Sequence, residues 1–96
     1  MSPINGAARH PSGPNDLPHF ERDLANRLAS QGAHGVRAEV SWMARPVAAF
    51  KVTLQEDDRR ETFGVPVRVL AADRDGRTFD RIVADALRRL RGRAGH

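Results

Sequence analysis

Residues 77–93 read RTFDRIVADALRRLRGR, and this stretch decides how the rest of the 96-residue chain is organised. Its apolar residues recur at intervals of three and four, which is the spacing of one face of an α-helix. They are Phe79, Ile82, Val83, Ala86, Leu87 and Leu90. Thr78 stands at the N-cap position, Asp80 lies in the first turn, and Gly92 follows the last apolar residue as a stop signal. The stretch therefore predicts an amphipathic helix with one side on a core and arginine on the other.

A first helix is predicted over residues 17–31. Asp16 is a candidate N-cap before it, and Phe20, Leu24 and Leu28 follow at intervals of four up to Gly32. Residues 1–15 are instead rich in proline, glycine and small polar side chains, which bury too little surface to offset the entropy of ordering. We expect residues 1–15 to form a disordered tail.

Three strands are predicted between the two helices. Residues 36–42 and 48–54 alternate apolar and polar side chains, as strands with one solvated face do. Residues 56–61 are all charged and are interpreted as a hairpin loop. A third strand, residues 63–70, carries Phe63, Val65, Val67 and Val69 on one face. Gly64 and Pro66 place this strand at a sheet edge or at a bulge, because proline cannot donate to a ladder.

This order predicts an α+β domain of the type α-β-β-β-α, spanning residues 16–93, with residues 94–96 flexible. The strands form a three-stranded antiparallel sheet, and both helices pack on one of its faces. The predicted core consists of Leu24, Leu28, Val36, Val40, Trp42, Phe50, Val52, Leu54, Phe63, Val65, Val67, Phe79, Ile82, Val83, Ala86, Leu87 and Leu90.

Composition narrows the classes of function. The chain has no cysteine and no apolar run near the ~20 residues of a membrane span, so we expect a soluble, cytoplasmic protein. Its histidines have no metal-ligand spacing, and its carboxylates and hydroxyls form no catalytic motif. We therefore expect no enzyme activity, no cofactor and no metal site.

The net charge is +4, and Lys51 is the one lysine among sixteen basic residues. Arginine makes bidentate contacts to phosphate, which favours a nucleic-acid partner. The candidate phosphate contacts are Arg77, Arg81, Arg88, Arg89, Arg91 and Arg93. In the alternative interpretation, these arginines are solvated and complement the dipole at the C-terminal end of the helix. A GC-rich genome, which encodes arginine in place of lysine, would then explain why the basic residues are arginines. The sequence shows no pair of exposed aromatic residues that would stack on bases. Any contact with a nucleic acid is therefore expected to recognise its backbone and shape rather than its base sequence.

Two families share features with this sequence. Residues 78–83, TFDRIV, and residues 86–91, ALRRLR, resemble the last helix of the ribosome hibernation-promoting factors. Gly76, Arg77 and Thr78, followed by Ile82 and Ala86, resemble the entry to the second helix of the double-stranded RNA-binding domain. The lysine pair of that domain is replaced here by Phe79 and Asp80. Both resemblances imply a sheet-and-two-helix module that binds structured RNA.

Two functional hypotheses follow. In the first, the chain binds structured RNA, in association with the ribosome or free of it, through the arginines of the last helix. In the second, it is a non-enzymatic inhibitor or adaptor that pairs with a protein partner, or with itself as a homodimer, through the edge formed by Phe63, Val65, Val67 and Val69.

Overall fold

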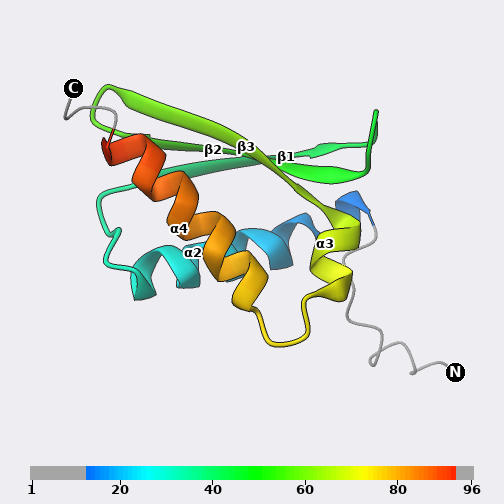
Figure 1. Cartoon of the computed structure of the whole chain (residues 1–96). Coiled ribbons are helices and arrows are strands. Elements are labelled where there is room, and N and C mark those ends of the chain that lie inside the picture. Colours follow the sequence, from blue (N-terminus) through cyan, green and yellow to red (C-terminus); the bar gives the residue numbers. More distant parts are fainter. Residues whose placement is uncertain (1–12, 93–96) are drawn as a thin grey trace, which may run out of the picture.

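A computed structural model describes residues 13–92 as one layer of strands and one layer of helices (Figure 1). A short 3-10 turn, Pro14–Asp16, leads into helix α2. The elements are α2 (Leu17–Ser30), β1 (Arg37–Met43), β2 (Ala49–Glu56), β3 (Arg59–Pro66), α3 (Val67–Ala72) and α4 (Arg77–Gly92). Residues 1–12 of the predicted disordered tail lie outside the described residues, whereas Gly13 caps the 3-10 turn and Pro14 and Asn15 belong to it. The predicted flexible residues 94–96 also lie outside the described residues.

The three strands form an antiparallel sheet in the order β1-β2-β3. Both long helices lie on the same face of this sheet, and the other face is uncovered by the described residues (Figure 1). The predicted α+β architecture is thus confirmed. The first helix ends at Ser30, one residue before the predicted end at residue 31. Gly32 follows as the predicted stop, with a φ of +75° that suits glycine, and the turn returns the Ala33 N–H to the Leu28 carbonyl.

Aromatic rings form the centre of the core. The Phe20 ring of α2 stacks on Phe50 of β2 with centroids 4.3 Å apart and on Phe79 of α4 with centroids 5.2 Å apart. Phe20 is 3% exposed, although the predicted core omitted it. Most of the predicted core is buried, but Val36, Val40, Trp42, Phe63, Val67 and Ile82 are only partly covered. One three-ring stack therefore joins both helices to the central strand.

The predicted loop over residues 56–61 is wrong. The turn consists of Asp57 and Asp58 alone, with Asp57 at a φ of +58°, a conformation that aspartate tolerates better than most residues. Glu56 pairs with Arg59 across it, and the ladder continues to Pro66 opposite Ala49 without a bulge. Charged side chains are compatible with strands here because Glu56 and Glu61 meet arginines of α4.

The third strand also ends earlier than predicted. Val67 and Val69 belong to the six-residue helix α3 rather than to a strand. The sheet stops at Pro66 because its partner strand β2 begins at Ala49, and the Val67 N–H donates to the Ala48 carbonyl just beyond. Pro66 then occupies the N-cap position of α3.

Candidate nucleic-acid interface

Two aspartates fix the start of α4. The Asp73 carboxylate accepts hydrogen bonds from the backbone N–H groups of Thr78 and Phe79 at 3.1 and 2.9 Å. Asp75 accepts one from the N–H of Arg77 at 3.2 Å. The predicted N-cap, Thr78, is therefore inside the helix, and the cap is supplied by residues of the preceding loop. Because a carboxylate already occupies this helix terminus, the terminus itself is a poor site for a phosphate.

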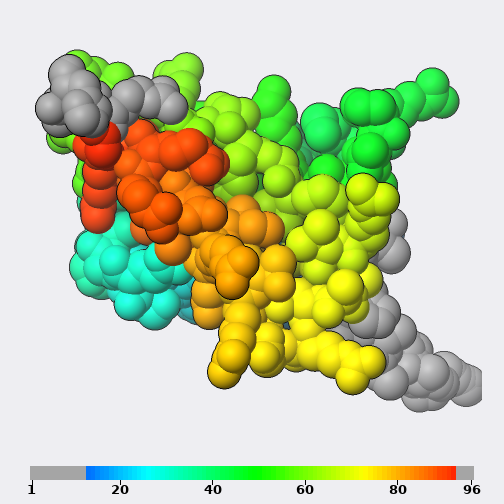
Figure 2. Space-filling model, viewed as in Figure 1, coloured from blue at the N-terminus to red at the C-terminus, as the bar shows by residue number. Residues whose placement is uncertain are grey.

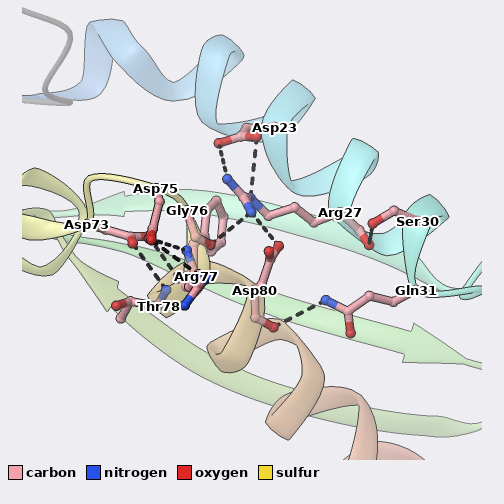
Figure 3. A network of polar contacts seen from close by, with 11 residues as sticks. Asp23, Arg27, Ser30, Gln31, Asp73, Asp75, Gly76, Arg77, Thr78 and Asp80 are labelled. Atoms are coloured by element: carbon pink, nitrogen blue, oxygen red, sulfur yellow. Dashed lines mark hydrogen bonds and ion pairs between the residues drawn. The ribbon is translucent and has the colours of Figure 1, made fainter.

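Arg27 of α2 holds the same end of α4 from the other side (Figure 3). Its guanidinium donates to the Gly76 carbonyl at 3.1 Å, pairs with Asp80 and Asp23, and lies 4.5 Å above the centre of the Phe79 ring. Gly76 has a φ of +80°, and a Cβ there would stand 2.9 Å from the Arg27 side chain. The position therefore favours glycine for its conformation, and a Cβ there would displace the Arg27 guanidinium. These contacts fix the direction in which α4 leaves the loop.

Two of the candidate arginines hold the other end of α4 on the sheet. The Arg89 Nε lies 2.7 Å from a carboxylate oxygen of Glu61, whose side chain is 10% exposed. Arg91 donates two hydrogen bonds, of 3.0 and 3.1 Å, to Glu56. These hydrogen bonds lower the pKa of the Glu56 carboxyl below its ordinary value. Arg89 and Arg91 thus have acidic partners within the fold, which the sequence pattern of the helix did not indicate.

The outward side of α4 carries Arg77, Arg81 and Arg88, all of them exposed. Figure 2 shows α4, orange to red, lying across the face of the molecule that is turned toward the viewer. Arg77 and Arg88 contact Asp75 and Asp85, but their side chains are 88% and 73% exposed, so these ion pairs are weak. Arg81 is exposed and makes no ion pair within residues 13–92. We call Arg77, Arg81 and Arg88 the outer arginines. The sixth candidate, Arg93, lies outside the described residues.

Sequence reasoning overlooked Arg74, which is exposed in the loop directly before α4. It adds a positive charge beside the first turn of the helix. The neighbouring acids are engaged, because Asp73 and Asp75 cap α4 and Asp80 contacts Arg27. The only sequence signal for Arg74 was its place in the turn that introduces the helix.

The residues of the predicted interaction edge do not share one strand. Phe63 and Val65 belong to β3, where Val65 is fully buried and Phe63 partly so, whereas Val67 and Val69 lie on α3. In the described part of the chain, no three His, Asp or Glu side chains gather in a way that could hold a metal ion. None of the helices formed by residues 13–92 has the length and apolar character needed to cross a membrane.

Comparisons of the chain with protein-family models, with curated proteins and with solved structures gave no significant match.

Proposed function

We propose that this chain is a non-catalytic module that binds structured RNA, with the outer arginines contacting phosphates. The observation that carries the proposal is the placement of Arg77, Arg81 and Arg88 along one exposed side of a single anchored helix. Four and seven residues separate them, so they lie roughly 6 and 10 Å apart along the helix axis. A row of arginines on a helix of fixed position is suited to contacting several phosphates of one backbone.

The fixed position of α4 supports the proposal because little ordering is needed on binding. Arg27 and Asp73 hold its first turn, while Glu61 and Glu56 hold its last turns. We assign Arg89 and Arg91 to this anchoring and remove them from the proposed contact set. Arg74 joins the set as a contact next to the first turn.

The character of the proposed partner follows from which side chains are exposed. Phe20, Phe50 and Phe79 are buried, and Trp42 packs against Phe50, so the described surface offers few rings for base stacking. Backbone contacts suit a folded or double-stranded nucleic acid better than a single strand. Apart from the short helix α3, the order of elements is the α-β-β-β-α order of the double-stranded RNA-binding domain, which favours RNA over DNA. Attachment to the ribosome is one way in which such a partner would be presented.

The test compares two triple variants of equal charge. Replacing the outer arginines with glutamine (R77Q/R81Q/R88Q) lowers the net charge from +4 to +1. Replacing three exposed cations elsewhere (R45Q/K51Q/R60Q) lowers it equally. Fluorescence anisotropy would measure binding of an RNA hairpin, single-stranded RNA and duplex DNA over a salt series, and circular dichroism would check folding.

We expect the wild-type chain to prefer the RNA hairpin, with log affinity falling against log salt at a slope of about −3 to −4 for four phosphate contacts, three from the outer arginines and one from Arg74. The outer-arginine variant should lose most of that slope, and the control should keep it. An equal loss of salt slope in both variants would show that the binding depends on net charge rather than on the outer arginines. Absence of binding at low salt would exclude the proposal. A preference for duplex DNA would show that the partner is DNA rather than RNA. Co-sedimentation with ribosomes is the next measurement after a positive result.

A further inference from the structure

Strand β1 forms an edge of the sheet that is open to pairing. It lies at the end of the order β1-β2-β3, and all seven of its residues pair continuously with β2. Its sequence, RAEVSWM, contains neither glycine nor proline, whereas the opposite edge strand contains Gly64 and Pro66. Within residues 13–92, no strand occupies the free side of β1. Its backbone donors and acceptors on that side are therefore available to an added strand.

An apolar groove of about 320 Å³ runs between β1 and α2 beside this edge. It is lined mainly by Leu24, Ala25, Leu28, Ala29, Val36 and Val40, with Glu21 and His34 as the polar residues among the remainder. Ala25 and Ala29 are exposed on the helix, and Ala38 is exposed on the strand. The helix thus leaves the core-side face of β1 partly uncovered, while the core-side face of β2 is fully buried.

The solvated face of β1 carries opposite charges two residues apart, on exposed Arg37 and Glu39. An antiparallel copy of β1, related by a two-fold axis through Ala38, would place Arg37 opposite Glu39 of the second copy. The two-fold symmetry also places Glu39 of the first copy opposite Arg37 of the second, because each contact in such an interface occurs twice. On the groove side the same register places Val36 opposite Val40 of the second copy. Both faces of the strand are therefore complementary to themselves in one register.

We infer that β1 pairs with β1 of a second copy of this chain, antiparallel and centred on Ala38, to join two sheets into one. The second copy also covers the groove of the first. Because the two strands run in opposite directions, the end of each groove that contains Glu21 lies beside the end of the other groove that contains His34. The preceding segment, residues 1–12, is a poorer occupant by sequence, since it contains Pro3 and Pro11 and few residues that favour strands. This interface is separate from the outer arginines.

A cysteine cross-link tests the register directly, because the chain has no cysteine of its own. In the proposed dimer, Ala38→Cys places its thiol opposite its own copy, at a Cα separation of roughly 5 Å, which lies within the range that a disulfide spans. The full chain, free of nucleic acid, should sediment at about twice its 10.6 kDa mass, and the variant should form a covalent dimer under mild oxidation. Thr62→Cys, exposed on β3, is the matched control and should remain uncross-linked.

Charge reversal gives an independent test. Arg37→Glu and Glu39→Arg each replace two attractive contacts with two repulsive ones, and each should weaken dimerisation about tenfold. The double variant R37E/E39R restores opposite charges and should recover the wild-type dimer, while Arg60→Glu should leave it unchanged. A wild-type chain that stays monomeric at all concentrations overturns the inference. A dimer that neither Arg37→Glu nor Glu39→Arg weakens, or one that is cross-linked equally through Thr62→Cys, places the interface elsewhere and overturns the inference too.

Discussion

The two flanks of the sheet are covered to different extents by their helices. On the β3 flank, α4 lays Val83, Leu87 and Leu90 over the strands, and two ion pairs join it to the strands, through Glu61 and through Glu56. On the β1 flank, α2 leaves a groove in which Val36 and Val40 are partly exposed. The comparison shows that two helices of similar length can cover one sheet unequally, and that the difference lies in side-chain size. Large aliphatic residues face β3, whereas Ala25 and Ala29 border the groove beside β1.

The largest difference between the flanks should appear when the same side chain is shortened on each. Val65→Ala on β3 shortens a fully buried side chain by its two methyl groups and should lower the free energy of unfolding by about 2 kcal/mol. Val40→Ala on β1 removes a partly exposed one and should lower it by less than about 1 kcal/mol. Urea denaturation at low protein concentration measures both. Equal losses would show that the β1 flank is as well packed as the β3 flank.

A smaller effect should come from the ion pair between Arg89 and Glu61. Arg89→Met keeps an apolar stem but leaves the nearly buried Glu61 carboxylate without that guanidinium, which should cost about 1 kcal/mol of unfolding free energy. The neighbouring Arg88→Met is the control. Its pair with Asp85 is largely exposed, so the loss should stay within about 0.5 kcal/mol. Thermal denaturation would separate the two, and equal shifts would contradict a structural role for Arg89.

The smallest expected effect is the pH dependence due to Glu56. Because Arg91 lowers the pKa of this carboxyl in the folded chain, its stabilisation is complete above its ordinary pKa and declines as the pH falls through the lower, folded-state value. At neutral pH, Glu56→Gln should be less stable than wild type. The difference should vanish at strongly acidic pH, where the wild-type carboxyl is also neutral. A difference that stays constant with pH would show that the charge of Glu56 contributes nothing.

Periodicity was sufficient to predict the order of the two long helices and the three strands, the face of α4 that packs and the two strands β1 and β2. The same reasoning failed at Val67 and Val69, because valines at alternate positions suit a strand only where a partner strand is present, and β2 has already begun at Ala49. The division of the arginines into anchoring and outward groups was also beyond the sequence. Arg89 and Glu61 are 28 residues apart, and Arg91 and Glu56 are 35 apart, so only the packed fold brings them together. Phe20 lies on the same predicted stripe as Leu24 and Leu28, so periodicity was sufficient to place it in the core, but its ring partners on β2 and α4 were beyond the sequence.

The edge-to-face contact between Trp42 and Phe50, with centroids 5.3 Å apart, gives the molecule an optical probe of its own. The sequence has one tryptophan and no tyrosine, so near-ultraviolet fluorescence originates from a single indole in β1. The indole is partly covered by the aromatic core, and its emission wavelength depends on how much water reaches it. The same wavelength therefore records both unfolding and any change in solvent access along the less covered flank, in the native chain and without an attached dye.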